Sequence, residues 1–335
     1  MSIRTEPDPH PDPHPQPHPE PRPAPKPGSE AEAQAQAGRG VSVIAGEYRQ
    51  LINLAYRLLG SLAEAEDAVQ EAFARWYAIS RQQQEAIVSP GAWLTTVVSR
   101  ICLDVLGSAR ARRERYVGEW IPEPLPDATE WMTGRPGDGR ADPADRIALD
   151  ESVDMAFLIV LEAMTPAERV AFILHDVFRY PFAEVAAIVD RTPAACRQLA
   201  SSARRRVRAA RAPVTPAGRQ ARVMRDFKRA WEARDIAALV GLLDPDATMV
   251  SDGGGLVGAA LRPVTGAGEI ARYMVAIADR APGMTLLVRS VNGRAGLVAQ
   301  RAGVTVTVAA FGLTDGLVTH IWAVRNPEKL QPWSL

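Results

Sequence analysis

Residues 193–208 carry basic and polar side chains at helical spacing, with no acidic residue among them. Thr192 is suited to cap a helix that begins at Pro193, and an apolar helical stretch, 182–189, precedes it. Two short helices joined by a tight turn place the second helix in the DNA major groove, where early side chains meet base edges and later arginines meet phosphates. We therefore predict DNA contacts from Ala194, Arg197, Gln198, Ser201, Arg204, Arg205 and Arg208.

A helical hairpin with a solvated basic face is the alternative interpretation of this stretch. Arginine occupies positions 204, 205, 206 and 208, and no acid balances the run. The summed positive potential of such a cluster attracts phosphates, so a polyanionic partner is favoured.

Charge is segregated along the chain, although 335 residues carry a formal net charge of zero. Residues 100–115 and 197–234 are rich in arginine, whereas 64–71 and 119–154 are mostly acidic. This length allows two or three domains. The distribution predicts separate surfaces for a nucleic acid and for a basic partner.

The two cysteines and the hydropathy pattern indicate in which cellular compartment the protein resides. Cys102 and Cys196 lie on apolar helix faces, which indicates buried, reduced thiols. No apolar run approaches the roughly 20 residues that span a bilayer, and the N-terminus lacks the apolar core of a signal peptide. We expect a cytoplasmic protein that does not enter a membrane.

Residues 1–42 are of low complexity, with proline alternating with polar residues before a run rich in alanine and glutamine. This composition cannot bury a core, so we expect a disordered tail. His10, His14 and His18 lie in this tail. No fixed geometry holds them as ligands, so no metal site is expected.

Residues 43–115 have the pattern of a compact helical domain. Ser61 and Glu64 have the spacing of a capping box and begin a helix with an acidic face. Ser89 and Pro90 begin a longer helix that ends in arginines.

These motifs, taken in order, resemble the extracytoplasmic-function (ECF) family of RNA polymerase sigma factors. Residues 61–77 read SLAEAEDAVQEAFARWY and residues 89–114 read SPGAWLTTVVSRICLDVLGSARARRE, which is similar to sigma region 2. The two-helix unit, within residues 150–212, falls where sigma region 4 would lie. The resemblance implies no catalytic activity, no cofactor, and two partners: core RNA polymerase (β′ and β subunits) and promoter DNA.

The resemblance also implies roles for individual residues. Asp67, Gln70 and Glu71 would dock on the clamp helices of β′, since an acidic face steers association with a basic one. A solvated amphipathic surface is the alternative for this face. Region 4 would read the −35 element through Ala194, Arg197, Gln198 and Ser201. The helix from residue 90 would open the −10 element, although Gly107 stands where many family members carry a basic residue. Candidate −10 contacts are Trp93, Arg100, Arg110, Arg112 and Arg113.

Residues 116–149 are expected to link the two modules. They contain WIPEPL at 120–125, which resembles the W-L-P-E-P motif of the SigJ-like ECF group, whose members carry a C-terminal SnoaL-like domain. The prolines at 122 and 124 restrict the backbone between Trp120 and Leu125, which favours docking of these two apolar side chains on the surface of another part of the protein. A rigid connector is the alternative.

Residues 219–335 predict an α+β domain: helices first, then a long antiparallel sheet. Strands are expected at 284–291, 296–300, 304–311 and 317–324, separated by glycine-containing turns. The pattern resembles the SnoaL-like cone. The DGGG sequence at 252–255 and NPEKL at 326–330 also match motifs of the SigJ-like group. The expected fold is thus multi-domain: two all-α modules followed by an α+β cone.

Cones of this type often house enzymes, and Asp252 and His320 are the catalytic candidates. The strands show no clear acid–base pair, so we expect no catalysis. The resemblance instead implies that the cone regulates the sigma modules in cis, and the cone is also a candidate site for a small-molecule ligand. The alternatives are a DNA-binding transcription factor without polymerase contacts, and a cone-fold enzyme or ligand sensor fused to one. The expected regulatory contact comprises Trp120, Pro122, Glu123, Asp252, Gly253, Gly254, Gly255, Asn326, Pro327, Lys329 and Leu330.

Overall fold

The computed structural model describes residues 47–113, 116–126, 154–210 and 215–334, without the side chains of 109–113. The expected tail (1–42) and the side chains of Arg110, Arg112 and Arg113 therefore lie outside the described residues. Within the described part, no helix combines the length and apolar composition needed to cross a bilayer, and no group of three acidic, histidine or cysteine side chains could hold a metal.

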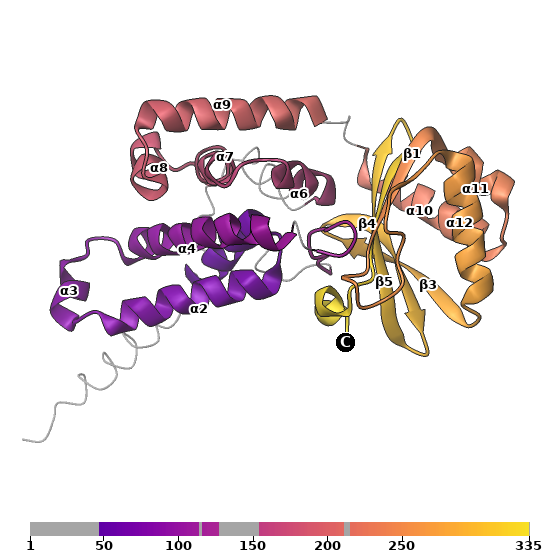
Figure 1. Cartoon of the computed structure of the whole chain (residues 1–335), viewed down its shortest axis with the longest axis horizontal. Coiled ribbons are helices and arrows are strands. Elements are labelled where there is room, and N and C mark those ends of the chain that lie inside the picture. The colour runs from indigo at the N-terminus through magenta and orange to yellow at the C-terminus, as the bar shows by residue number, and fades with distance from the viewer. Residues whose placement is uncertain (1–46, 114–115, 127–153, 211–214, 335) are drawn as a thin grey trace, which may run out of the picture. The chain divides into compact units, whose positions relative to one another are not determined.

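The first helical module contains a helix at 47–59, α2 (Leu62–Ala78), α3 (Arg81–Ala86) and α4 (Pro90–Arg113). Gly60 ends the first helix with a φ of 71°, a left-handed conformation that favours glycine. The Ser61 hydroxyl then accepts from the Glu64 N–H at the start of α2. Helices α2 and α4 lie side by side (Figure 1). The short α3, with its own capping box, was not predicted.

The second helical module contains α6 (Met155–Glu162), α7 (Pro166–Phe172), a π-helical turn (Ile173–Val177), α8 (Phe182–Val189) and α9 (Pro193–Ala210). Asp190 turns the chain between α8 and α9 with a φ of 55°. The Thr192 hydroxyl accepts from the Ala195 N–H, so α9 is capped as expected. Helix α6 was not predicted.

One hydrophobic core runs through both helical modules, and it includes Val98 and Cys102 of α4, Leu174 of the π-helical turn and Ile188 of α8. Polar contacts cross the same boundary. Buried Arg169 donates to the Leu58 carbonyl oxygen at 2.9 Å, and burial lowers the pKa of its guanidinium to about 10. The two modules are therefore packed together as one body in this conformation.

The C-terminal domain begins with α10 (Ala217–Glu232) and α11 (Ile236–Leu242), followed by β1 (Leu243–Asp252), β2 (Val264–Thr265) and α12 (Ala267–Arg280). Strands β3 (Met284–Val291), β4 (Arg294–Arg301), β5 (Val304–Thr314) and β6 (Leu317–Val324) follow, and a 3-10 helix, η2 (Pro327–Trp333), ends the domain. The sheet order is β2-β1-β6-β5-β4-β3. The four strands predicted between residues 284 and 324 pair antiparallel as expected, whereas the parallel pairing of β1 with β6 was not predicted.

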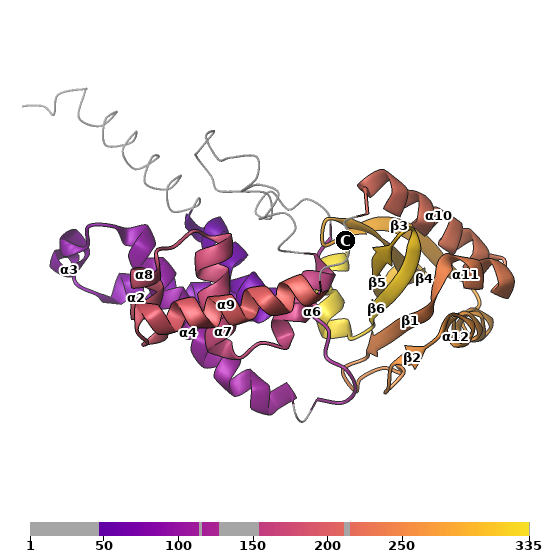
Figure 2. The same cartoon turned by 90° about the horizontal axis from the view of Figure 1, so that it is seen from above.

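The two faces of this sheet are covered differently. Helices α10, α11 and α12 lie on one face (Figures 1 and 2), where Phe227, Met274 and Ile321 belong to one apolar core. On the opposite face a second cluster joins the sheet to Ile121 of the linker and Met155 of α6. The expected fold class, two helical modules followed by an α+β domain, is confirmed.

Candidate functional site

The linker segment 116–126 lies against the sheet face that the helices leave uncovered. Ile121 and Leu125 are buried, with relative exposures of 0% and 1%. Ile121 belongs to the apolar cluster that contains Val308 and Val324 of the sheet and Leu330 of η2. The WIPEPL motif is thus a docked segment in this conformation, not a solvated spacer.

Asp252, at the end of β1, holds the linker backbone. Its carboxylate is fully buried and accepts from the Ile121 N–H at 3.0 Å and from the Lys329 ammonium at 2.7 Å. Lys329 also donates to the Ile121 carbonyl oxygen at 2.6 Å and lies 4.1 Å from the centroid of the Trp120 ring. One buried ion pair therefore binds both backbone groups of Ile121.

Tyr116 of the linker and Asn326, which follows β6, extend this contact around Asp252. The Tyr116 hydroxyl donates to Asp252 at 2.6 Å and accepts from the Asn326 amide at 3.0 Å. Burial, with the hydrogen bond to Asp252, raises the pKa of Tyr116, so its hydroxyl stays a donor.

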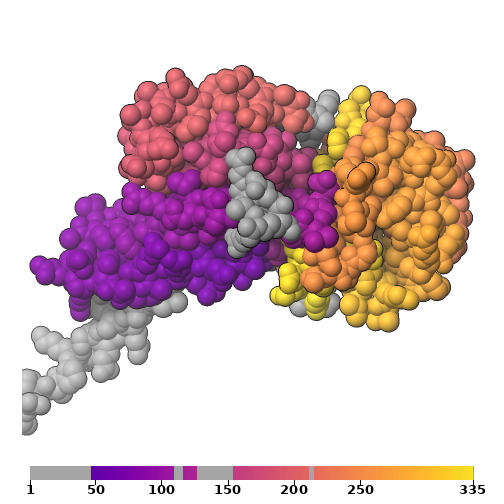
Figure 3. Space-filling model, viewed as in Figure 1, coloured from indigo at the N-terminus to yellow at the C-terminus, as the bar shows by residue number. Residues whose placement is uncertain are grey.

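The glycines at 253–255 are needed because the loop passes close to its neighbours. Gly254 has a φ of 63°, and a Cβ there would lie 2.5 Å from the Asn326 amide nitrogen. A Cβ at Gly255 would lie 3.0 Å from Val117 of the linker, and one at Gly253 would lie 2.4 Å from the Val257 carbonyl oxygen. In Figure 3 the magenta atoms of the linker lie against the orange atoms of this loop.

Asn292, in the turn between β3 and β4, joins three parts of the molecule. Its backbone N–H donates to the Leu125 carbonyl oxygen at 2.9 Å, and its side-chain oxygen accepts from the Leu125 N–H at 3.0 Å. Its amide also donates to the buried Tyr56 hydroxyl at 2.8 Å. The sequence predicted only a glycine-containing turn between residues 291 and 296, and it did not indicate this role for Asn292. We refer to Asp252, Asn292, Asn326 and Lys329 as the linker lock.

Glu123 connects the linker to the first helical module. Its carboxylate accepts from the Leu62 N–H at 2.8 Å and from the Ser61 hydroxyl at 3.2 Å, so it binds the N-terminus of α2. Burial raises the pKa of Glu123, and the hydrogen bond from Leu62 opposes that shift. Pro122 lies beside Gly60. The remaining predicted residues, Pro327 and Leu330, lie in η2, where Leu330 is buried.

We expect Glu123→Ala to lower the free energy of unfolding by about 1–2 kcal/mol, because two donors at the start of α2 lose their acceptor. Glu123→Gln keeps one acceptor oxygen and should cost less. Urea titration of the full chain measures both, with exposed Glu119→Ala as the matched control. Equal stability of Glu123→Ala and Glu119→Ala would show that the contact contributes nothing.

The predicted DNA-reading residues lie along α9. Ala194, Arg197 and Gln198 are exposed and Ser201 is half-buried. Arg204 is engaged within the protein, donating to Asp176 at 2.6 Å, whereas the side chains of Arg205 and Arg208 are exposed. The face that α9 presents is therefore suited to base edges near its start and to phosphates near its end.

The residues expected to bind polymerase are exposed, whereas Trp93 and Arg100, expected to bind the −10 element, contact other parts of the protein. Asp67, Gln70 and Glu71 are exposed on one side of α2, and Glu71 pairs with Arg75. The half-buried ring of Trp93 packs against that of Trp76 with centroids 5.3 Å apart. Arg100 donates to the Ala187 carbonyl oxygen of α8 at 2.8 Å, which holds the two modules together.

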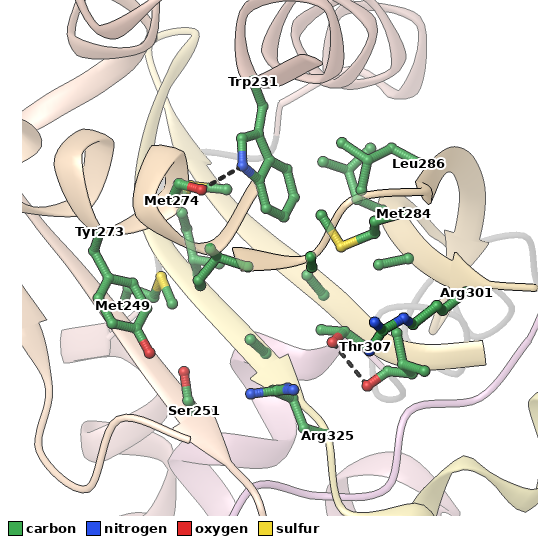
Figure 4. Close-up of a pocket in the computed structure, with 18 of the residues that line it drawn as sticks. Trp231, Met249, Ser251, Tyr273, Met274, Met284, Leu286, Arg301, Thr307 and Arg325 are labelled. Carbon is green, nitrogen blue, oxygen red and sulfur yellow. Dashed lines mark hydrogen bonds between the residues drawn. The ribbon is translucent and has the colours of Figure 1, made fainter. Parts of the chain in front are cut away.

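A cavity of about 150 Å³ lies between the sheet and its covering helices. Trp231 and Leu286 lie at one end, and Ser251 and Arg325 at the other (Figure 4). Asp252 points to the opposite sheet face, since successive strand residues alternate. His320 stacks on Trp322 at 5.5 Å, outside the cavity lining. The two catalytic candidates are thus not brought together in the cavity.

Comparison with known proteins matches both helical modules to known families. Residues 43–113 match the family model of sigma-70 region 2, and residues 155–207 match that of sigma-70 region 4. The ECF RNA polymerase sigma factor SigJ of Mycobacterium tuberculosis is 38% identical over 295 residues, which cover 84% of this chain and 90% of that protein. The probable ECF sigma factor SigI of the same species is 35% identical over 285 residues, covering 84% and 91%.

A solved structure extends the likeness to all three parts of the chain. The crystal structure of Mycobacterium tuberculosis SigJ aligns with a TM-score of 0.67 and 34% identity, covering 87% of this chain and 98% of that one. The chain belongs to the family of ECF RNA polymerase sigma factors, proteins that bind core RNA polymerase and direct it to promoter DNA.

Proposed function

We propose that the C-terminal domain of this sigma factor regulates it in cis, by holding the linker and thereby keeping regions 2 and 4 packed together. The observation that carries the proposal is the linker lock, which binds the backbone of Ile121 and Leu125 on one sheet face. A tethered domain acts at a high effective concentration, so even modest contacts shift the population toward the closed form.

In the closed form, which is the conformation of this structure, regions 2 and 4 are packed against each other. This conformation is unsuited to promoter binding because the two promoter elements are far apart on the DNA. Elements near −10 and −35 lie roughly 25 base pairs apart, which is roughly 80 Å of B-DNA. Regions 2 and 4 share one hydrophobic core, and Arg100, a proposed −10 contact, is bound to α8. Promoter binding therefore requires these modules to separate, and the linker must leave the sheet to permit it.

Once released, region 2 binds core polymerase through Asp67, Gln70 and Glu71, whose exposure supports steered association with the β′ clamp helices. The helix α4 opens the −10 element through Arg100, Arg110, Arg112 and Arg113. Trp93 contributes to base capture only if it leaves its contact with Trp76. In region 4, Ala194, Arg197, Gln198 and Ser201 read the −35 element, and Arg205 and Arg208 bind phosphate.

Arg208→Ala should weaken promoter binding by the holoenzyme and reduce the slope of log K against log salt by about 0.9, because one phosphate contact is lost. Arg206 donates to the Ala163 carbonyl oxygen and is the matched control. Arg206→Ala should leave the salt slope unchanged. Titrations of a promoter fragment at several salt concentrations measure the difference, and equal slopes for the two variants would contradict the assignment.

Removing residues 326–335 tests the regulatory proposal. The shortened chain lacks Lys329 and Asn326, so we expect tighter binding to purified core polymerase and more transcript from a promoter library than the full chain gives. Lys228 lies in the same domain, with a partly exposed side chain far along the sequence from the deleted segment, so Lys228→Met controls for a general effect of altering this domain. Unchanged core affinity, open-complex yield and transcript level would contradict regulation in cis.

We also propose that the cavity of the C-terminal domain holds a small molecule. Its lining is mostly apolar with a few polar groups at one end, which is the usual composition of a ligand pocket. A screen for ligand-dependent thermal stabilisation of the full chain tests this, and no stabilisation by any compound would contradict it.

A further inference from the structure

We propose that the cavity binds a small organic monoanion, a carboxylate attached to an apolar body the size of one aromatic ring, and that its binding loosens the linker lock. The inference rests on the regulatory role proposed above. It adds the chemical class of the ligand and the route by which the ligand acts.

The size of the cavity limits the apolar body. A dry cavity of about 150 Å³ lined by apolar side chains accommodates a benzene-sized molecule, and this cavity has a volume of about 150 Å³. Trp231, Met274, Leu286 and Phe311 form its apolar part. A single ring or a short branched chain therefore fits, whereas a steroid or a long acyl chain does not.

The polar end of the cavity favours a negative charge. Arg301 and Arg325 both line it, together with the hydroxyl groups of Ser251, Tyr273 and Thr307 (Figure 4). No aspartate, glutamate or histidine is among the described residues that line the cavity. Two guanidinium groups without an acidic neighbour there attract a carboxylate, which accepts two parallel hydrogen bonds from one arginine.

Arg325 connects this polar end to the linker lock. Its guanidinium donates to the Gly258 carbonyl oxygen in the loop that follows the DGGG sequence. Its backbone N–H, like that of Asn326, donates to the Asp252 carbonyl oxygen, at 2.7 and 3.0 Å. A carboxylate that draws the guanidinium into the cavity removes the bond to Gly258 and loosens the loop that packs on Val117.

Calorimetric titration of the full chain with benzoate and with neutral benzamide tests the ligand class. We expect saturable binding of benzoate, about tenfold weaker binding of benzamide, and about tenfold weaker benzoate binding by Arg301→Met. Arg289 is exposed on the same sheet and absent from the cavity lining, so Arg289→Met should bind benzoate as the natural chain does. Equal affinity for benzoate and benzamide, or no saturable binding of benzoate, phenylacetate or 3-methylbutanoate, would overturn the proposal.

The effect on the lock is measured separately, as the affinity of the full chain for core polymerase with and without saturating benzoate. We expect an increase of about threefold or more, and in the Arg301→Met variant we expect the same increase only at an about tenfold higher benzoate concentration. Binding without any increase would overturn the coupling. Regulation in cis would then still be decided by the 326–335 deletion without ligand, so the two proposals fail by different results.

Discussion

Lys329→Met is expected to release the linker, and to raise the affinity of the full chain for core RNA polymerase by at least about tenfold. The substitution leaves the Asp252 carboxylate buried without its cation, and breaking a buried pair from one side costs about 3–5 kcal/mol. It also removes the donor to the Ile121 carbonyl oxygen. The free energy of unfolding and the core affinity should therefore change in opposite directions, one falling and the other rising.

Two further variants separate this effect from general damage. Lys228 pairs with Glu232 at 2.7 Å, the same distance as Lys329 to Asp252, but both partners of that pair are partly exposed. Lys228→Met should therefore change stability by less than about 1 kcal/mol. Adding Asp252→Asn to Lys329→Met removes the buried charge and should restore part of the lost stability. If Lys329→Met behaves like Lys228→Met in both measurements, the ion pair does not hold the linker.

Asn292→Gly should also open the closed form, with a loss of about 2–4 kcal/mol in the free energy of unfolding. The side-chain amide donates to the Tyr56 hydroxyl and accepts from the Leu125 N–H, so its loss deprives two buried groups of their partner. Glycine tolerates the φ of 51° at this position. The change therefore removes the amide without straining the turn.

Asp315→Gly provides the matched control for Asn292→Gly. Asp315 has a φ of 54° in the turn between β5 and β6, and its side chain is exposed. We expect little change in stability, and in limited proteolysis the linker should be cut faster only in Asn292→Gly. Equal cleavage rates in the two variants would mean that Asn292 acts only as a turn residue.

The sequence predicts the helices and hairpins of this chain well where short-range chemistry determines them. Helix α8 has the predicted bounds, and the Thr192 cap begins α9 as expected, because caps and apolar spacing are local signals. Strands β3 and β6 also have the predicted bounds. The positive φ of Asn292, Ala302 and Asp315 explains why their turns could be read from a following glycine.

Long-range partners could not be predicted in the same way. The apolar face of a helix predicts that the face is buried, but it does not identify the helix that packs against it. The shared core of regions 2 and 4 was therefore not expected. The parallel pairing of β1 with β6 joins segments 65 or more residues apart, and no turn marks it. The Glu123 carboxylate at the start of α2, and the contact of Asn292 with Tyr56, likewise depend on tertiary structure alone.

The distance between regions 2 and 4 tests the central claim most directly. Ala92 of α4 and Glu184 of α8 are exposed, so Ala92→Cys and Glu184→Cys provide sites for a fluorescent donor and acceptor. The natural Cys102 and Cys196 are buried, and burial raises the pKa of both thiols, so they should react slowly with the dyes. We predict efficient energy transfer in the free chain, a lower efficiency in Lys329→Met, and the lowest in the complex with core polymerase and promoter. Transfer that is equally efficient in the free chain and in Lys329→Met would contradict the claim that the C-terminal domain keeps the two regions together.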